Sequence, residues 1–259
     1  MAGRVDADEP AEGVLRLAIA NPARRGALDH PILDALADAV RDAPARGARA
    51  ILVTGHEGHF SSGYDIGDIP DDVFAEQAEK LVAHPFTAAL DALEACDLPT
   101  VAALPGHAIG GGLELALCCD LRVAAPGARL GMPPAKLGLV YSHTGLRRFL
   151  DVVGEPRTRE LFLLGATVDA GRAERWGLVN EVAEDAGARG LELASALAAN
   201  APLSVRGTKQ VLRMLLRARL TEEEEARAIA LREASFASED MREGVRAFTE
   251  KRPARWQGR

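Results

Sequence analysis

Short apolar runs alternate with helical patterns over the first half of the chain, and this rhythm constrains the fold more than any other feature. Four of these runs have the pattern of strands: residues 14–19, 50–53, 100–104 and 120–124. A helix capped by Asp29 is expected over residues 29–42, and a second helix over residues 71–96, broken near Pro85. This order is typical of an α/β fold, in which the loops at strand ends carry the chemistry.

The second half of the chain has an almost wholly helical pattern from about residue 143 onward. Thr221 and Glu224 have the spacing of a capping box, which predicts the start of one helix. Apolar residues recur at helical spacing in the tail: Val211, Leu212, Leu215, Leu216, Val245 and Phe248. Because the composition shifts where this tail begins, we expect a core unit over residues 1–198 and a helical oligomerisation region over residues 199–259.

The composition excludes several classes of protein. Of the 259 residues, 47% are apolar and 27% charged, which is ordinary globular usage. The formal net charge of −7 has the wrong sign for a protein that neutralises nucleic-acid phosphates. No apolar run approaches the roughly 18 residues of a membrane span, and no signal peptide is recognisable. Cys96, Cys118 and Cys119 form no CxxC pair, so we expect reduced thiols, no metal site and a cytoplasmic location.

Two glycine-containing segments follow expected strands and carry the strongest functional signal. They are FSSGYDI at residues 60–66 and GHAIGGGLE at residues 106–114. Glycine allows a backbone to approach a ligand closely, so one N–H group from each loop could form an oxyanion hole around a carbonyl oxygen. Glu114, in the first turn of the following helix, is placed to transfer a proton there. Taken separately, each loop is better explained by packing, and Glu114 by the helix dipole.

Six segments, in order along the chain, resemble the crotonase superfamily, which includes the enoyl-CoA hydratases and isomerases. They are NPARRGALDHPILDAL, FSSGYDI, PTVAALPGHAIGGGLELALCCDLRVAA, PPAKLGLVYSHTGLRRF, DAGRAERWGLVNEV and EGVRAFTEKRPARW. The ordered set extends over about residues 12–258 and is far more specific than any single motif. The resemblance implies a repeated ββα spiral core, followed by a helical region that builds a trimer, two of which commonly stack as a hexamer.

The resemblance also implies roles for individual residues. The N–H groups of Ser62 and Gly111 would bind the thioester carbonyl of an acyl-CoA, and Glu114 would be a catalytic acid/base. Contacts with the CoA moiety are implied at these positions: Arg24, Arg25, Ala27, Gly63, Tyr64, Asp65, Ile66, Phe248 and Lys251. For the two arginines and Lys251, solvated surface charge is the alternative interpretation. No metal and no cofactor besides the CoA of the substrate are expected.

One position departs from the hydratase pattern. Pro134 stands where hydratases have a second catalytic glutamate, so the usual mechanism with two carboxylates cannot operate unchanged. The nearby Tyr141 is similar in position to a tyrosine of methylmalonyl-CoA decarboxylases, which contacts the carboxylate that leaves as CO2. Those enzymes, however, carry a histidine where Tyr64 stands, and a buried ring with a bonded hydroxyl is the alternative for Tyr141.

Three functions therefore remain open at this point. The first is an enoyl-CoA hydratase-type lyase, in which Glu114 transfers protons to and from a thioester enolate. The second is a malonyl- or alkylmalonyl-CoA decarboxylase, in which Tyr141 orients the carboxylate of the substrate. The third is a catalytically weak CoA- or RNA-binding relative, against which the negative net charge and the retained Glu114 both argue.

Overall fold

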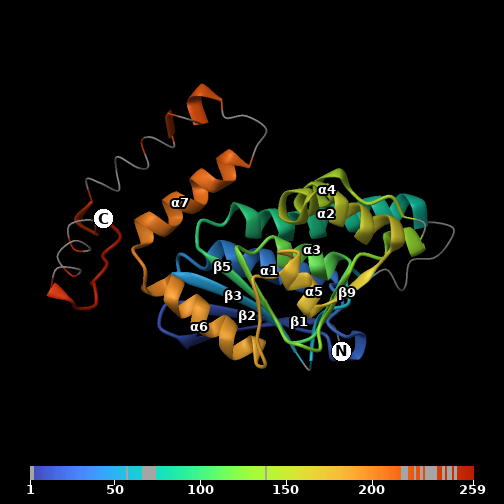
Figure 1. The fold of residues 1–259 in the computed structure, drawn as a ribbon, viewed down its shortest axis with the longest axis horizontal. Coiled ribbons are helices and arrows are strands. Elements are labelled where there is room, and N and C mark those ends of the chain that lie inside the picture. Colours follow the sequence, from blue (N-terminus) through green and yellow to red (C-terminus); the bar gives the residue numbers. More distant parts are fainter. Residues whose placement is uncertain are drawn as a thin grey trace.

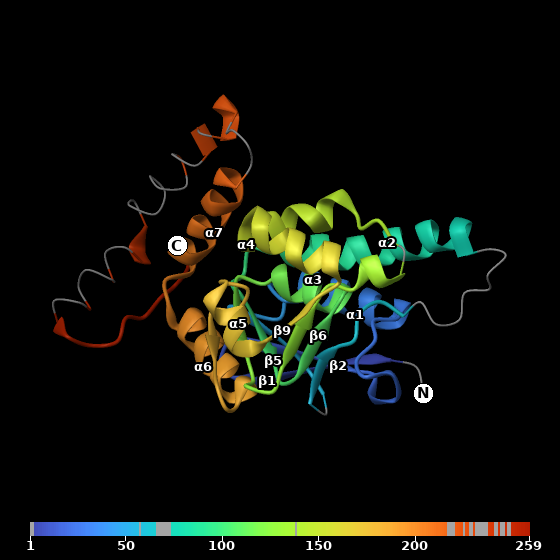
Figure 2. The same cartoon turned by 45° about the vertical axis from the view of Figure 1, so that its right-hand side comes forward.

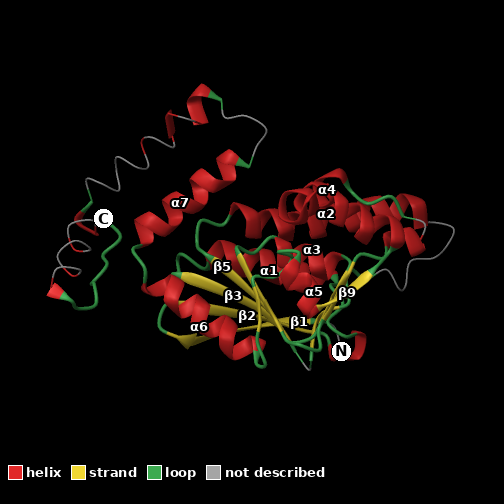
Figure 3. Cartoon of the chain, in the orientation of Figure 1, coloured by secondary structure: helices red, strands yellow, loops and turns green. Residues whose placement is uncertain are grey.

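The strands are divided between two sheets (Figure 1, Figure 3). The computed structural model describes residues 3–56, 58–65, 74–137, 139–216, 221–224, 226–227, 230, 238–240, 243, 247 and 250–259, without the side chains of 74–84 and 137. The larger sheet has the strand order β1-β2-β3-β5-β7-β10, and the smaller sheet has the order β4-β6-β8-β9. The strands are β1 (Arg4–Ala11), β2 (Val14–Ala20), β3 (Ala50–Gly55), β4 (His59–Ser61), β5 (Thr100–Leu104), β6 (His107–Ile109), β7 (Leu121–Ala124), β8 (Arg129–Gly131), β9 (Thr167–Asp169) and β10 (Glu181–Val182).

A pair of strands followed by a helix repeats three times along the chain. In each repeat the first strand joins the larger sheet (β3, β5, β7) and the second joins the smaller sheet (β4, β6, β8). Equivalent strands of successive repeats pair in parallel. The three helices are α2 (Phe74–Ala95), α3 (Gly111–Leu117) and α4 (His143–Leu164). This arrangement is the ββα spiral that was expected.

The chain passes from one sheet to the other at turns that require glycine. A Cβ on Gly106 would lie 1.5 Å from the carbonyl oxygen of Gly58, and a Cβ on Gly55 would lie 1.9 Å from that of His59. Any other residue would clash with backbone, which cannot move aside as a side chain can. These turns place the starts of β4 and β6 next to each other, and thereby align the two loops that follow these strands.

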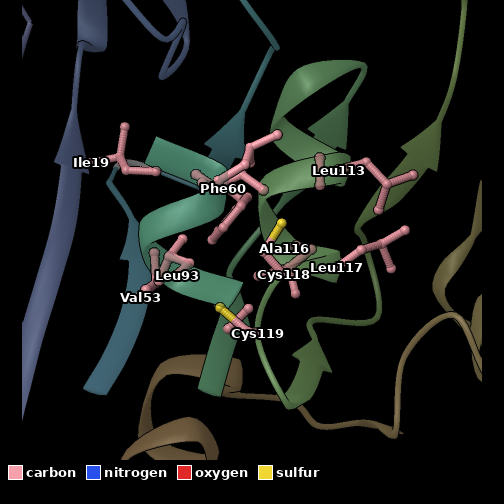
Figure 4. Close-up of a cluster of buried hydrophobic side chains, with 14 of the residues drawn as sticks. Ile19, Val53, Phe60, Leu93, Leu113, Ala116, Leu117, Cys118 and Cys119 are labelled. Atoms are coloured by element: carbon pink, nitrogen blue, oxygen red, sulfur yellow. The ribbon is translucent and has the colours of Figure 1, made fainter. Parts of the chain in front are cut away.

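The core lies between the sheets and the helices that cover them (Figure 4). Ile19 and Val53 from the larger sheet face Leu93 of α2, and Leu113 and Ala116 of α3 belong to the same buried cluster. Each large apolar side chain that is fully buried contributes roughly 1.5–3 kcal/mol relative to exposure. The short helix α3 is buried along its whole length, so the backbone at its start is fixed by packing.

The three thiols are free, and two of them belong to this core, as expected. Cys118 and Cys119 are buried, while Cys96 is partly exposed. Burial raises the pKa of the Cys118 thiol well above its ordinary value and that of Cys119 to about 12. Both thiols are therefore protonated and unreactive at neutral pH.

The first two helices agree with the sequence except at Pro85. Helix α1 (His30–Asp42) begins after Asp29, whose side chain accepts a hydrogen bond of 3.0 Å from the backbone N–H of Ile32. The expected break near Pro85 is wrong, because α2 continues through this residue. An internal proline costs a helix about 3 kcal/mol. The buried side chains that follow it in α2 offset this cost: Phe86, Ala89, Leu90 and Leu93.

Six strands lie outside the four predicted runs: β1, β4, β6, β8, β9 and β10. Five of them have only two or three residues, which is too short for a period-two pattern to be recognised. β1 is longer, but its sequence RVDADEPA is charged and contains Pro10. Such residues are tolerated at the edge of a sheet, which is where β1 lies.

Helices α5 (Ala170–Arg175), α6 (Ala186–Ala199) and α7 (Pro202–Leu215) follow the spiral. Helix α6 packs Ala194 and Ala198 on the outer face of the larger sheet. Helix α7 leads away from the sheets toward the tail (Figure 2). The buried Lys209 anchors it, because its Nζ lies 2.7 Å from Asp120 Oδ2 and 2.9 Å from the carbonyl oxygen of Leu98. The end of α7 exposes three large apolar side chains: Leu212, Leu215 and Leu216.

Part of the prediction for the tail can be compared with the structure. Thr221 and Glu224 form the expected capping box, because the backbone N–H of each donates to the side chain of the other. Val245 and Phe248 lie outside the described residues. A division at residues 198/199 falls at the end of α6, and it stays a prediction. In the described part of the chain, no helix is both long and apolar enough to cross a membrane.

Candidate active site

The first wall of the site joins two segments that are far apart in the sequence. The turn around η1 (Pro22–Arg24) and the loop after β4 are connected by backbone hydrogen bonds. The N–H of Leu28 donates to the carbonyl oxygen of Gly63 at 2.8 Å, and the N–H of Asp65 donates to that of Leu28 at 3.0 Å. The structure thus brings together the two stretches for which CoA contacts were expected.

Ser62 does not supply the expected oxyanion donor in this geometry. Its N–H donates to the carbonyl oxygen of Arg25 at 3.1 Å, and its hydroxyl donates to that of Arg24 at 2.9 Å. Both donors of Ser62 therefore tie the loop to the early turn. The assignment of Ser62 has to be corrected, since a backbone N–H already used in this way is not free to bind a ligand.

The second loop meets the first where the glycines lie. A Cβ on Gly63, whose φ is +104°, would lie 3.5 Å from the backbone nitrogen of Gly111. A Cβ on Gly111 would in turn lie 3.4 Å from the backbone nitrogen of Tyr64. Gly111 is the first residue of α3, and the first N–H groups of a helix have no acceptor within it. The close approach therefore places the backbone nitrogens of Tyr64 and Gly111 side by side.

Aromatic side chains border this pair of backbone nitrogens. The Tyr64 hydroxyl lies 2.8 Å from His30 Nε2, and the Tyr64 ring packs edge-on against Phe86 with centroids 6.0 Å apart. Phe86 itself reaches to within 2.9 Å of the position a Cβ on Gly111 would occupy. Burial raises the pKa of Tyr64, so its hydroxyl stays protonated. The paired nitrogens are thus bordered by two aromatic rings and by one hydroxyl–imidazole contact.

Glu114 is the buried acid of the site. Its side chain is 1% exposed, on the turn of α3 that follows Gly111. Tyr141 donates to Glu114 Oε2 at 2.5 Å, and Arg148 Nη1 donates to Oε1 at 2.8 Å. Burial raises the pKa of Glu114, and the Tyr141 hydrogen bond and the Arg148 charge oppose part of that rise. A carboxyl group with a raised pKa is suited to exchanging protons near neutral pH.

Arg148 is the residue that sequence reasoning missed. Two N–H groups of its guanidinium bind the Glu94 carboxylate at 2.6 and 2.8 Å, and a third binds Glu114. Although burial disfavours the cation, Glu94 and the other carboxylates nearby raise the pKa of Arg148 above its ordinary value. A partial signal was present in the sequence, because Arg148 follows the buried Gly145 by three residues and therefore lies on the same helix face.

Pro134 and Tyr141 occupy the region where a second acid was sought. Pro134 begins the short helix η2 (Pro134–Leu137) and is buried. Tyr141 lies against Glu114, and both contact Gly145: a Cβ there would lie 2.5 Å from the Tyr141 ring and 2.8 Å from Glu114 Oε1. Burial and the Glu114 charge raise the pKa of Tyr141 well above its ordinary value. The Tyr141 hydroxyl is therefore a proton donor that is directed at Glu114.

The remaining predicted contacts have different surroundings. Arg24 Nη1 pairs with Asp65 Oδ2 at 2.5 Å, while the neighbouring Arg25 is exposed with a φ of +54°. Ala27 is buried beside them. Lys251 is exposed in the tail beyond α7, which Figure 1 shows on the side of α7 away from α3. Ile66 and Phe248 lie outside the described residues. The described residues contain no group of three or more His, Cys, Asp or Glu side chains that could hold a metal ion.

Comparisons with known proteins agree with the fold. The sequence profile of the enoyl-CoA hydratase/isomerase family matches residues 9–259. The chain is 34% identical over 249 residues to the probable enoyl-CoA hydratase echA6 of Mycobacterium tuberculosis, covering 96% of this chain and 97% of that one. It is 32% identical over 253 residues to the 2,3-dehydroadipyl-CoA hydratase of Escherichia coli, covering 95% and 96%.

Solved structures give the same result. A putative enoyl-CoA hydratase/isomerase family protein from Hyphomonas neptunium superimposes with a TM-score of 0.90 at 36% identity, over 98% of both chains. The enoyl-CoA hydratase of Bacillus anthracis superimposes with a TM-score of 0.91 at 25% identity, over 99% of this chain and 100% of that one. The chain belongs to the enoyl-CoA hydratase/isomerase family, the crotonase superfamily, and has its fold.

Proposed function

We propose that the protein is an enoyl-CoA hydratase-type lyase that stabilises a thioester enolate. The observation that carries this proposal is the position of Glu114, a buried carboxyl group on the turn that follows the paired backbone nitrogens of Tyr64 and Gly111. Two hydrogen-bond donors and one acid/base are the groups needed to form an enolate and to move a proton to or from its α-carbon. Membership of the family supports an acyl-CoA thioester as the substrate.

In this mechanism the thioester oxygen accepts hydrogen bonds from the N–H groups of Tyr64 and Gly111. Water adds to the β-carbon of the enoyl group, and the negative charge moves onto the thioester oxygen as the enolate forms. Removing one donor from such a site typically costs about 3–4 kcal/mol of transition-state stabilisation. Tyr64 takes the role first given to Ser62, whose N–H binds Arg25.

Glu114 has to serve both proton transfers, because Pro134 carries no acid or base. As a carboxylate it accepts a proton from the attacking water, and as the acid it returns a proton to the α-carbon. The raised pKa of Glu114 makes its protonated form more accessible than that of an exposed carboxyl group, which favours a group that alternates between base and acid. With a single carboxyl group alternating between roles, hydration is expected to be slow but measurable.

The decarboxylase is the second candidate, and the charges around Glu114 disfavour it. One guanidinium, that of Arg148, is shared among three carboxylates, those of Glu114, Glu94 and Asp91. A malonyl carboxylate entering next to them would meet excess negative charge. In addition, the Tyr141 hydroxyl, which would orient that carboxylate, donates to Glu114. The third candidate, a weak CoA- or RNA-binding relative, is disfavoured by the negative net charge and by the retained Glu114.

The proposal extends to binding and assembly. The turn with Arg24, Arg25 and Ala27 and the loop from Gly63 to Ile66 would hold the CoA moiety, with Phe248 and Lys251 contributed by a neighbouring subunit. A homotrimer, or a hexamer of two trimers, in the cytoplasm is the proposed state. CoA enters as part of the substrate, and no separate cofactor, nucleic acid or membrane takes part.

A two-substrate assay tests the function directly. Purified protein is given crotonyl-CoA, with hydration followed by loss of the conjugated enoyl absorbance, and separately methylmalonyl-CoA, with release of CO2 measured. We expect hydration without CO2 release. Release of CO2 without hydration would select the decarboxylase. Binding of both thioesters without turnover would select the weak relative.

A further inference from the structure

We propose that Arg148 is a positioning residue, whose guanidinium is held by Glu94 and which fixes the orientation and the ionised state of the Glu114 carboxylate. Arg148 touches no reacting atom, and it acts through Glu114. Its effect on turnover rests on the proposed function, whereas its effect on the charge of Glu114 can be measured without any substrate.

Glu94 holds the planar guanidinium of Arg148 in one orientation. Nε and Nη2 of Arg148 bind the two oxygens of Glu94 at 2.6 and 2.8 Å, which is the paired geometry that a planar guanidinium makes with a carboxylate. This pairing fixes the plane of the group. Nη1 then points to Glu114 Oε1 at 2.8 Å. The direction of the bond to Glu114 is therefore set by Glu94.

Glu94, Arg148 and Glu114 are progressively more buried. The exposed fraction falls from 42% at Glu94 to 10% at Arg148 and 1% at Glu114. The ion pairs thus extend from the surface of α2, through α4, to the buried acid on α3. A buried carboxylate that lacks a partner is strongly disfavoured, so Arg148 is what permits Glu114 to ionise in this environment.

The surroundings of Glu114 contain no second cation among the described contacts. Tyr141 faces it from the segment before α4, and Cys118 lies one turn further along α3. Glu94 and Asp91, both on α2, pair with Arg148, and the negative charge of Glu94 disfavours the ionised form of Glu114. Removing the Arg148 charge therefore leaves Glu114 with negative neighbours and one neutral donor, and its proton is then released only at higher pH.

Three variants and a matched control distinguish two effects of Arg148 on Glu114, that of the guanidinium's geometry and that of its charge. Arg148→Met removes the cation, Arg148→Lys keeps the charge but cannot bind Glu94 and Glu114 in this forked geometry, and Glu94→Gln loosens the guanidinium. Arg147→Met is the control. It makes the same change one residue away, where Arg147 is exposed and pairs with Asp151 at 2.8 Å.

The kinetic test follows crotonyl-CoA hydration against pH. For Arg148→Met we expect kcat to fall roughly 100-fold at neutral pH, the size of a lost acid/base contribution, with KM little changed. The acidic limb of the pH profile should move to higher pH. For Arg148→Lys, the acidic limb should stay near its wild-type pH while kcat falls. Glu94→Gln should lower kcat less than Arg148→Met does. Arg147→Met should resemble the wild type.

A substrate-free measurement keeps the proposal testable if no enoyl-CoA is turned over. The carboxyl carbon of Glu114 is labelled with 13C-glutamate, assigned with Glu114→Gln, and titrated by NMR in each variant. The proposal predicts a midpoint at higher pH in Arg148→Met and an unchanged one in Arg147→Met. An unchanged midpoint in Arg148→Met would overturn it, whatever the assay shows. If Arg148→Met does not fold, the Arg148→Lys and Glu94→Gln variants decide, and wild-type kcat and titration in both would also overturn it.

Discussion

Tyr141 donates a hydrogen bond to Glu114 Oε2 with an oxygen–oxygen distance of 2.5 Å, so the buried acid of α3 is held by a phenol from the segment between η2 and α4. The bond supports the ionised form of Glu114 against a burial that disfavours it. It also directs the Tyr141 phenol toward the acid and not toward an incoming substrate carboxylate. The pair therefore favours proton transfer over carboxylate recognition at this site.

Replacing Tyr141 with Phe tests the value of this bond. The change removes one hydrogen bond to a charged group, worth about 1.5–3 kcal/mol, so kcat for hydration should fall roughly 10–100-fold. The pKa of Glu114 should rise, because the bond lowers it in the native protein. The Phe ring keeps the contact with Phe162, whose centroid is 5.4 Å from that of Tyr141, so thermal stability should change little. An unchanged pH profile would show that the bond has no role in the chemistry.

Glu114→Gln should nearly abolish hydration without weakening the fold. Burial raises the pKa of Glu114, so the folded protein binds its proton more tightly than the unfolded chain does. Its contribution to stability is thus fully present below the ordinary carboxyl pKa and is lost as the pH rises through the raised value. The neutral glutamine lacks this loss, which amounts to about 1.4 kcal/mol for each pH unit that separates the pKa of the folded protein from that of the unfolded chain. Thermal unfolding of the wild type and of Glu114→Gln between pH 4 and 8 measures this difference in stability. A wild type that becomes more stable relative to Glu114→Gln as the pH rises would contradict the account.

The two backbone donors are tested by a pair of substitutions at one position. Gly111→Pro removes the N–H group and should abolish turnover. Gly111→Ala keeps the N–H and adds a Cβ whose nearest contact, 2.9 Å away, is the ring of Phe86, which can shift. We expect Gly111→Ala to retain measurable activity and Gly111→Pro to have none, each checked for folding by circular dichroism. Wild-type-like turnover by a correctly folded Gly111→Pro variant would exclude the Gly111 N–H from the mechanism.

The exposed leucines at the end of α7 predict an assembly. Leu212, Leu215 and Leu216 are each more than half exposed in the single chain, which is unfavourable for large apolar side chains in water. Light scattering should find a trimer or hexamer, and Leu215→Glu should shift it toward smaller species. Ser204→Glu, at an exposed site on the same helix, is the control. A monomeric wild-type protein at micromolar concentration would disprove the assembly.

The sequence predicted the repeated order of strands and helices because these segments have a recognisable period. It did not predict β4, β6, β8 and β9, which have three residues each and are too short to show a period. The turns at Gly55 and Gly106, which carry the chain to β4 and β6, become evident only when the two sheets are seen together. Glu114 and Gly111 could be found because they adjoin a glycine run. Ser62 was chosen in place of Tyr64 because spacing alone does not show which N–H an early turn already binds.

Arg148 was missed for a different reason. Two adjacent arginines on a helix usually indicate a solvated face, and Arg147 does lie on such a face. Only the packing of α4 against α2 and α3 surrounds Arg148 with carboxylates that are distant in the sequence. The spacing from Gly145 indicates only that Arg148 faces inward, and nothing local in the sequence shows which carboxylates it meets.

The most direct test of the proposed function is the rate of crotonyl-CoA hydration by the wild-type protein, by Glu114→Gln and by Pro134→Glu. With Glu114 as the only carboxyl group of the mechanism, the wild type should hydrate slowly. Glu114→Gln should be nearly inactive, and Pro134→Glu should be faster by up to the roughly 10²–10⁴-fold that a second acid/base supplies. Hydration by Glu114→Gln at the wild-type rate would contradict the account.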